Sequence, residues 1–274
     1  MKQNVNNAMT IDVEDYFQVS AFEDKFNPKN WDSIDPRVEK NTHRLLDLLA
    51  DHGGKATFFT LGWVAERFPE LVKRISNEGH EVGSHGMMHK RATDQSRDEF
   101  AKDVGDAKKL LEDLTGSEVI GYRAPSFSFT SDNQWVYEVL QELGYKYSSS
   151  VYPVVHDHYG IPDAPRFRYN TQTTIDEVPL STLRMFGKNI PISGGGYFRL
   201  YPYLFTQYAI NTFMSQEKKP YIFYLHPWEV DPQQPRISGI NAKTQFRHYI
   251  NLARVEGRLT ALLKDFRWGT VQEV

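Results

Sequence analysis

The stretch PRVEKNTHRLLDLLADHGGKATFFTL, residues 36–61, contains the alternation that decides the fold. Its first part, Pro36 to His52, has apolar residues at helical spacing, and the glycines at 53 and 54 favour a helix end directly after it. The inward-facing positions are Val38, Leu45, Leu46, Leu48 and Leu49. Its second part, Lys55 to Leu61, is a short apolar run typical of a buried strand. The stretch therefore predicts one amphipathic helix followed by one strand.

The same alternation continues on both sides of this stretch. Short apolar or β-branched runs predict strands at Ala8–Val13, Glu81–Ser84, Glu118–Tyr122, Lys146–Ser150 and Tyr221–Leu225. Apolar residues at helical spacing predict helices at Val64–Asn77, Asp94–Leu114, Trp135–Leu143 and Lys243–Leu263. Between Tyr152 and Tyr201 the rhythm breaks, and a long functional loop with one short strand-like run, Thr174–Pro179, is expected. The alternation predicts an α/β fold with a mostly parallel sheet, open or closed into a barrel.

The composition favours one catalytic domain. With 274 residues, 40% hydrophobic and 14% aromatic, the chain can bury a large core, so residues 1–274 are expected to form a single domain. A net charge of -3 does not provide the clustered cations that a nucleic-acid backbone requires. Cysteine is absent, so any metal must be bound by His, Asp or Glu. Without an apolar signal-peptide core or a run of ~20 apolar residues, the protein is expected to be cytoplasmic and to lack a membrane span.

Two histidines in the segment SHGMMH, His85 and His89, follow the expected strand Glu81–Ser84. They are four residues apart and could bind one cation if the chain begins a helical turn there. On spacing alone, such a pair is more often structural or on the surface than metal-binding. Its position after a strand, where α/β barrels place their active sites, favours a metal site.

Three carboxylates, Asp12, Glu14 and Asp15, stand in TIDVEDYF at the end of the first expected strand. Burying like charges together is unfavourable unless a cation or an arginine offsets them. For one acid alone, a solvated turn would be the better interpretation. The three together fit better with one metal ligand and one general base. On an extended chain Asp12 and Glu14 face the same way, whereas Asp15 faces away unless the strand has already ended.

Two further polar residues also follow expected strands. Arg123, in GYRAPSFS, stands two residues before Pro125 and could hold an aspartate ionised through charge-assisted hydrogen bonds. His226, in YIFYLHPWE, ends a strongly apolar strand, which suits a general acid at a barrel rim. An ordinary surface arginine and a packed core histidine are the alternatives.

In this order, the segments resemble the motifs of the polysaccharide deacetylase family, also called NodB-type or carbohydrate esterase family 4, over roughly Met9 to Leu263. In that family an acidic motif supplies the base and a metal ligand, a [ST]HxxxH motif supplies two more ligands, and RxP and LxH motifs follow. These motifs match Asp12–Asp15, His85 with His89, Arg123 with Pro125, and Leu225–His226. The resemblance implies a distorted (β/α) barrel with its site at the C-terminal ends of the strands.

The sequence is most similar to a bacterial subgroup associated with exopolysaccharide synthesis and exosortase systems. Its members look like DVEDYFQV, YSSSVYP, GGGYFR and YLHPWE, strings that stand here at Asp12–Val19, Tyr147–Pro153, Gly194–Arg199 and Tyr224–Glu229. Two features depart from the wider family. The usual adjacent Asp pair is spread over four residues, so either Glu14 or Asp15 could bind the metal. The fourth motif commonly has an Asp that orients the catalytic His, whereas this chain has Ser148–Ser150 in that region.

The resemblance implies a metal-dependent hydrolase that removes N-acetyl groups from amino sugars of a bacterial polysaccharide or its biosynthetic precursor. Asp12 would be the base, Arg123 would keep it ionised, and His226 would protonate the leaving amine. A divalent metal, zinc in the first place with cobalt, nickel or manganese also acceptable, would bind to the imidazoles and to an acid of the first motif. Substrate contacts are expected from Pro125, Ser126, Tyr197 and Trp228, with an oxyanion bound near the Ser126 backbone and a sugar ring stacked on an aromatic side chain.

Other interpretations are weaker. Gly194–Gly196 lacks the ending of a phosphate loop and no helix start is expected directly after it, so a turn close to a sugar is preferred. His156 and His158 are expected to belong to a structural or substrate-lining loop. Hydrolysis of another C–N bond, such as a cyclic amide, and a catalytically silent sugar-binding barrel stay open as functions. Acetate release from an N-acetylated glycan distinguishes them from the deacetylase.

Overall fold

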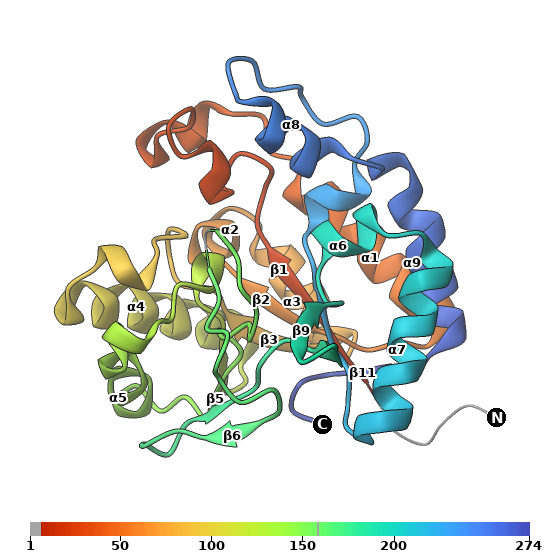
Figure 1. Ribbon diagram of the computed structural model, residues 1–274. Coiled ribbons are helices and arrows are strands. Elements are labelled where there is room, and N and C mark those ends of the chain that lie inside the picture. The colour runs from red at the N-terminus through yellow and green to blue at the C-terminus, as the bar shows by residue number, and fades with distance from the viewer. Residues whose placement is uncertain (1–6, 158) are drawn as a thin grey trace. The chain divides into compact units, whose positions relative to one another are not determined.

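The computed structural model describes residues 7–157 and 159–274 (Figure 1). The chain divides into two compact units, each with its own strands and helices. One unit combines the N-terminal part up to Ala56 with Ile192–Val274, and the other is Thr57–Pro191. The single domain expected over residues 1–274 stays a prediction.

The first unit is built on the fully buried strand β1 (Asn7–Val13). This strand pairs in parallel with β10 (Ile222–Leu225) and with the short β11 (Trp268–Gly269). The helices of the unit are α1 (Val38–His52), α6 (Gly195–Leu200), α7 (Tyr203–Glu217), α8 (Ala242–Tyr249) and α9 (Val255–Asp265). Both α1 and α7 pack against α9 (Figure 1). Because Ile11 is paired with Leu225, Asp12 near the end of β1 lies beside His226, the first residue after β10.

The second unit contains a run of parallel strands. In spatial order these are β2 (Thr57–Thr60), β3 (Glu81–Ser84), β4 (Gly121–Tyr122), β5 (Tyr147–Ser148) and β7 (Asp176–Glu177), with β6 (Tyr169–Asn170) antiparallel to β7. A separate hairpin joins β8 (Thr182–Met185) to β9 (Lys188–Pro191). The helices are α2 (Gly62–Arg67), α3 (Pro69–Asn77), α4 (Arg97–Thr115) and α5 (Trp135–Glu142). Since parallel strands end at one edge, His85, Arg123 and Ser149 emerge together after β3, β4 and β5.

Two helices predicted as continuous are broken. The expected helix Val64–Asn77 consists of α2 and α3, separated at Phe68 with φ -126 and ψ 58, because the ring of Pro69 begins a new helix more readily than it continues one. The expected helix Lys243–Leu263 consists of α8 and α9, separated by a short segment in which Asn251 has φ 54. The helical spacing of apolar residues continues across both breaks, so the sequence pattern did not reveal them.

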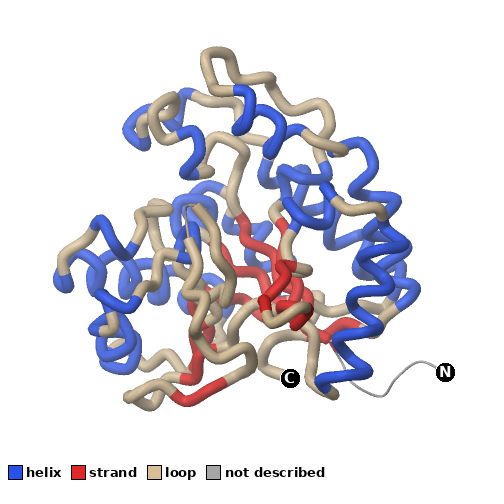
Figure 2. The backbone as a smooth tube through the Cα atoms, viewed as in Figure 1, coloured by secondary structure: helices blue, strands red, loops and turns tan. Residues whose placement is uncertain are grey.

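The segment that follows Gly194 was also predicted wrongly. Helix α6 begins at Gly195, directly after that glycine, and α7 follows Pro202. Helix α7 buries Ala209, Ile210 and Phe213 but exposes 76% of Leu204 and 61% of Tyr208. Apolar residues therefore occupy both of its faces, which hides the helical pattern in the sequence. Of the loop expected between Tyr152 and Tyr201, the strand-like run Thr174–Pro179 contains β7, but the hairpin of β8 and β9 was not predicted. The irregular parts of this region are drawn in tan in Figure 2.

Candidate active site

In the first unit, two acids and a histidine converge where β1 and β10 end. Nε2 of His226 lies 3.5 Å from Oε1 of Glu14 and 4.0 Å from Oδ2 of Asp12. Both acids are buried, with 2% of each exposed. Burial alone would lower the pKa of His226, but the charge of Glu14 and the hydrogen bond and charge of Glu229 raise it to about 9. The imidazole can therefore carry a proton at neutral pH, as a general acid must.

The third acid of the motif, Asp15, points its carboxylate at backbone amides. Its oxygens accept hydrogen bonds from the N–H groups of Tyr16 at 2.8 Å, Arg37 at 2.5 Å and Val38 at 2.8 Å. The last two amides open α1, so Asp15 caps this helix. Burial raises the pKa of Asp15 to about 6. Because the amides engage both of its oxygens, Glu14 is the better acid ligand of the two, and this choice stays a prediction.

His226 has an acidic partner that sequence reasoning missed. Its Nδ1 lies 2.9 Å from Oε1 of Glu229 in the 3₁₀ helix η6 (Pro227–Val230), and Nδ1 must donate because a carboxylate accepts. Nε of Arg199, on α6, donates to Oε2 of Glu229 at 2.6 Å. Glu229 is fully buried and Arg199 is 3% exposed. Burial would raise the pKa of Glu229, but Arg199 and the hydrogen bond from His226 lower it to about 2.

In the sequence, Glu229 and Arg199 were marked only by belonging to two of the subgroup motifs. Glu229 ends YLHPWE and Arg199 ends GGGYFR, and neither residue had an assigned role. An acid three residues after a polar residue is a common helix-capping pattern, so the spacing from His226 to Glu229 is not specific.

Trp228 was expected to stack on a sugar, but two imidazoles cover its ring. The ring stacks on His226 with centroids 5.1 Å apart and on His248 with centroids 4.3 Å apart, and only 5% of the residue is exposed. This geometry indicates that Trp228 supports the ring of His226, and its predicted substrate contact stays a prediction. Tyr197 stacks on Tyr201 with centroids 5.9 Å apart and stays partly exposed, so its sugar contact remains a prediction.

In the second unit, His85 and His89 come together after β3, with ring centroids 5.3 Å apart. Nδ1 of His85 lies 2.8 Å from the carbonyl oxygen of Arg123 and must be the donor, because a carbonyl only accepts. This bond assigns the proton to Nδ1 and makes Nε2 the nitrogen that can coordinate a cation.

A strained loop, rather than the helical turn that was considered, brings the two imidazoles together. Gly86 has φ 76 and His89 has φ 52. Oδ2 of Asp103, on α4, accepts the Met87 N–H at 3.0 Å. A Cβ at position 86 would lie only 2.6 Å from that oxygen, so the loop requires glycine there. Strained backbone of this kind recurs at active sites and is consistent with a ligand role for His89, which stays a prediction.

Arg123 is fully buried in the second unit, and serines hold it in place. Its Nε donates to the carbonyl oxygen of Ser149 at 2.8 Å, and its Nη2 donates to Oγ of the same residue at 2.7 Å. Oγ of Ser150 accepts the N–H of Ala124 at 2.9 Å. Ser149 and Ser150, in the region where the wider family commonly has an Asp, therefore hold Arg123 and the backbone of Ala124 in place. The interaction of Arg123 with Asp12 stays a prediction.

The next segment, the 3₁₀ helix η4 (Pro125–Phe127), is strained. Ser126 has φ 55 and Phe127 has φ 50, two consecutive left-handed residues other than glycine. Pro125 is buried and Ser126 is partly exposed. Such strain is consistent with the predicted substrate contacts of Pro125 and Ser126, which stay predictions.

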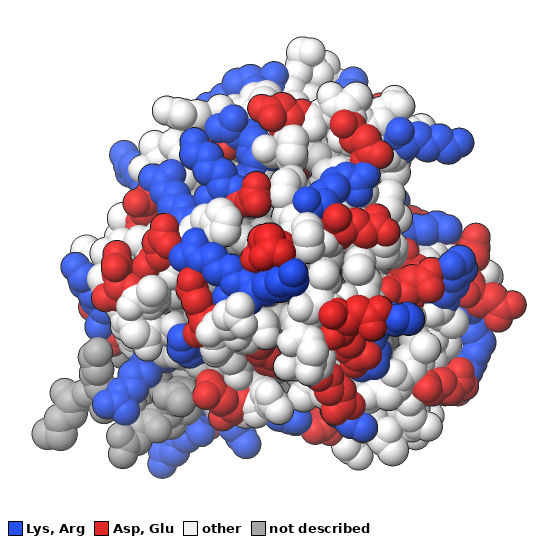
Figure 3. All heavy atoms as spheres, turned by 180° about the vertical axis from the view of Figure 1, so that it is seen from behind, with Lys and Arg blue, Asp and Glu red and all other residues white. Residues whose placement is uncertain are grey.

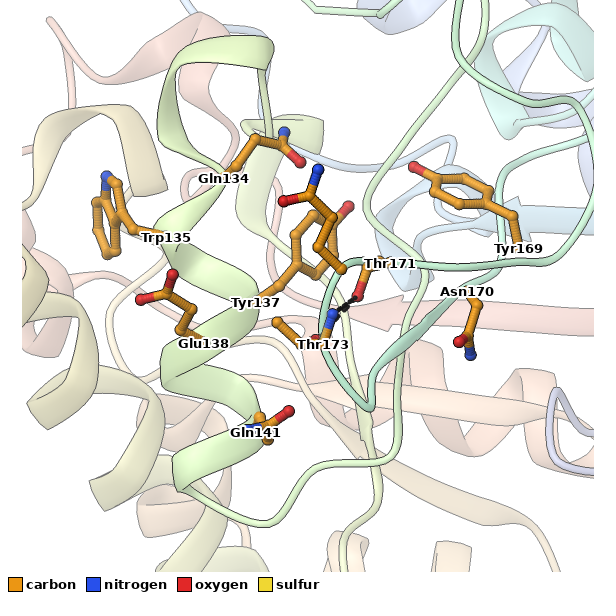
Figure 4. A pocket seen from close by; sticks show the side chains of 10 residues that line it. Gln134, Trp135, Tyr137, Glu138, Gln141, Tyr169, Asn170, Thr171 and Thr173 are labelled. Carbon is orange, nitrogen blue, oxygen red and sulfur yellow. Dashed lines mark hydrogen bonds between the residues drawn. The ribbon is translucent and has the colours of Figure 1, made fainter.

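A cavity of about 590 Å³ lies elsewhere in the second unit, between α5 and the segment Tyr169–Thr173 (Figure 4). Its lining residues are Gln134, Trp135, Tyr137, Glu138, Gln141, Tyr169, Asn170, Thr171, Gln172 and Thr173. None of these was a predicted site residue, and several of their polar groups are engaged locally. Oγ1 of Thr171 accepts the Thr173 N–H at 3.3 Å, for example. The cavity does not belong to the candidate active site.

The histidine loop after Tyr152 shows packing contacts. His156 stacks on Tyr159 with centroids 3.9 Å apart, in agreement with a structural loop. The second histidine of that segment, His158, lies outside the described residues.

Acidic and basic side chains alternate on the face drawn in Figure 3. Helix α4 has the same mixture of charges, because Lys102 pairs with Asp106 and Lys109 with Asp113. This pattern resembles an ordinary solvated surface rather than a nucleic-acid footprint. Within residues 7–157 and 159–274, no helix has the length and apolar character needed to cross a membrane.

Comparison with known protein families divides the chain near its middle. A model described as polysaccharide deacetylase matches residues 28–148, which contain His85, His89 and Arg123. Over these residues the chain matches the polysaccharide deacetylase family. A domain of unknown function (DUF3473) matches residues 149–274 and contains Arg199 and His226. The deacetylase match thus includes the predicted histidine ligands, while the second match includes the predicted acid.

One curated relative of this chain is a peptidoglycan-N-acetylglucosamine deacetylase of Bacillus cereus. It is 36% identical over 105 residues, which cover 38% of this chain and 47% of the relative. The chain thus spans less than half the length of that protein.

Solved structures extend the likeness over the whole chain. A Mycobacterium smegmatis protein with a tentative polysaccharide deacetylase description superposes with a TM-score of 0.61 at 16% identity, covering 100% of this chain and 91% of its own. A carbohydrate esterase family 4 pseudoenzyme from Bacillus anthracis superposes with a TM-score of 0.51 at 15% identity, covering 100% of this chain and 66% of its own. At such identities the likeness concerns the fold alone. It confirms the predicted fold class, an α/β fold of the distorted (β/α) barrel type.

Proposed function

We propose that this protein is a metal-dependent hydrolase that removes N-acetyl groups from amino sugars of a bacterial polysaccharide or its biosynthetic precursor. The observation that carries the proposal is the first-unit cluster, in which His226 has a fixed Nδ1 proton and faces the buried acids Asp12 and Glu14. A sugar-binding protein needs no such pairing of a proton donor with a candidate base. The deacetylase names of the relatives support the same reaction class.

The proposed roles follow from the chemistry of each side chain. Asp12 takes the proton of the attacking water, and Arg123 keeps that carboxylate ionised. His226 then protonates the leaving amine through Nε2, since its Nδ1 proton is engaged by Glu229. Backbone N–H groups near Ser126 would bind the developing oxyanion.

The donor set fits a divalent cation. Nε2 of His85 would be the coordinating nitrogen because Nδ1 donates to a carbonyl oxygen, an arrangement common among metal-binding histidines. His85, His89 and Glu14 would hold the ion, with zinc preferred and cobalt, nickel or manganese acceptable for such ligands. A cation bound there would polarise the acetamide carbonyl and lower the pKa of water.

Acetate release tests the proposal directly. The protein would be incubated with N-acetylated oligosaccharides and with lipid-linked or nucleotide-linked N-acetyl sugars, while metal content is measured on the same sample. We expect acetate from at least one substrate, loss of activity with a chelator, and recovery with added divalent metal. Full activity in metal-free protein would overturn the mechanism.

The panel also distinguishes the alternatives. Hydrolysis of a cyclic amide without acetate release would support a different C–N hydrolase. Binding of the glycans without any turnover would support a silent module, for which the Bacillus anthracis pseudoenzyme of the same fold is a precedent.

For His226→Ala we expect kcat to fall by about 10²–10⁴ with unchanged metal content, the range typical for removing a positioned proton donor. An acetate ester needs little protonation of its leaving group, so kcat on the ester should fall less than kcat on the amide. Steady-state kinetics on both substrates checks this. Equal losses would indicate a structural or oxyanion-binding role instead.

The wild-type rate should decline at high pH as the acid loses its proton. The pKa of His226 is raised from 6.5 to about 9, so the protonated form persists through neutral pH and is lost as the pH rises towards 9. A bound cation would repel the imidazolium and shift this loss to lower pH. The decline of the rate at high pH should be absent in His226→Ala. If it persisted unchanged, it would arise from another group.

A further inference from the structure

We propose that Glu229, fixed by Arg199, is the positioning residue for His226, so that the residues matched by the domain of unknown function would supply both the acid and its orientation. The inference rests on the proposed function in one respect, namely that His226 acts as the general acid. It gives a role to residues 199 and 229, which the sequence motifs left without one.

One carboxylate oxygen of Glu229 determines how the ring of His226 is oriented. Oε1 accepts both the ring Nδ1–H at 2.9 Å and the backbone N–H of His226 at 3.0 Å. The ring and its own backbone are therefore tied to the same atom, which fixes the tautomer and the rotation of the imidazole. Nε2 is consequently directed at Asp12 and Glu14, the side on which a proton would be delivered.

The other carboxylate oxygen is held by an arginine with little freedom of its own. Arg199 donates from Nε to Oε2 and from Nη1 to the carbonyl oxygens of Arg247 at 2.9 Å and His248 at 2.7 Å. A buried carboxylate without a cation would tend to take up a proton, and its pull on the imidazole would weaken. Arg199 thus keeps Glu229 charged and stationary.

Glycines make the room that this arrangement requires. A Cβ at position 195 would lie 1.9 Å and 2.1 Å from the two carboxylate oxygens of Glu229. Gly194 has φ 99, and a Cβ there would lie 2.3 Å from the ring of Tyr224. Residues of GGGYFR therefore pack closely against residues of YLHPWE around the Glu229 carboxylate. This packing explains why glycine stands at positions 194 and 195.

A purely structural role for Glu229 is the competing explanation. Its side chain accepts the backbone N–H at the start of η6, and a cap of this kind would stabilise the turn without affecting the acid. The two roles differ in one consequence. A positioning residue acts only through His226, whereas a structural cap affects the protein whether or not the imidazole is present.

A double-mutant cycle with Glu229→Gln and His226→Ala tests this difference. We expect Glu229→Gln to lower kcat on the amide by about 10–100-fold, as for other residues that orient a reacting group, with little change in KM and metal content. In the His226→Ala background the same change should have almost no effect on kcat. An equal factor in both backgrounds, or an effect on KM alone, would overturn the proposal.

Asp231→Asn is the matched control. Asp231 is another buried acid paired with an arginine, Arg37, and lies two residues further along the same segment. This change should lower stability while leaving kcat within a few-fold of wild type. If it reproduced the kinetics of Glu229→Gln, general loosening of the segment would explain the result and the proposal would fail.

A spectroscopic readout separates this inference from the proposed function. In protein with ¹⁵N-labelled histidine, NMR should show a slowly exchanging Nδ1–H that is absent from His226→Ala and is shifted or lost in Gly195→Ala, whose Cβ displaces the carboxylate. The wild-type measurement does not depend on turnover, so it decides the geometry even if no acetate is released. Absence of an Nδ1 proton on His226 would overturn the positioning role.

Discussion

His85→Ala is expected to give a folded protein that contains no stoichiometric metal and releases no acetate. The imidazole is buried, and its Nδ1–H bond to the Arg123 carbonyl presents Nε2 for coordination. With one of three proposed protein ligands removed, water would enter the site and the remaining ligands would bind too weakly. The loss should exceed the about 10²–10⁴-fold that one proton-transfer group provides, because base and oxyanion would be affected together.

Metal analysis by mass spectrometry, acetate release and circular dichroism on the same samples check this expectation. His89→Ala should behave alike. His52→Ala, at the end of α1 and assigned no function, is the control and should keep both metal and activity. A His85→Ala protein with full metal content would show that the ion lies elsewhere.

The second large effect is expected for substitutions of the three acids of the first motif. Their variants should show that Asp12 is the base, Glu14 the metal ligand and Asp15 the helix cap. Asp12→Asn should keep the metal and lower kcat by about 10²–10⁴, since a neutral amide cannot take a proton from water. Glu14→Gln should lose the metal. Metal content and kcat measured for both variants distinguish the two patterns, and loss of metal in Asp12→Asn would show that base and ligand are exchanged.

Asp15→Asn provides the third pattern. This carboxylate binds backbone N–H groups of Tyr16, Arg37 and Val38, so the change should lower the melting temperature while the metal is retained. The expected cost is about 0.5–2 kcal/mol, as for the loss of a helix cap. Metal loss with unchanged stability would instead identify Asp15 as the ligand.

Much of the fold could be predicted because its signals are local. The expected strand Glu81–Ser84 has the predicted bounds, and α1 ends at His52 before a left-handed Gly53, as predicted. The predictions were wrong where apolar residues keep their helical spacing although the helix itself ends. Apolar spacing continues across Phe68 and Asn251, yet proline and a left-handed residue end the helices there. Helix α7 was missed because its exposed face is also apolar.

For the candidate site, the sequence by itself determined which chemical groups follow which strands. Asp12, His85, Arg123 and His226 each stand directly after an apolar run, and that order of residues carries the family resemblance. Residue type and position after a strand are properties of short segments, so they are visible without a structure.

Only the tertiary structure decided how those groups are held. Asp15 caps a helix that begins 23 residues later, Arg123 is fixed by a serine 26 residues away, and Glu229 is fixed by an arginine 30 residues away. Such partners are chosen by where the folded backbone brings distant segments together, and no periodicity or spacing records that choice. The orientation of His226, which the sequence left unexplained, is therefore decided by packing between α6 and η6.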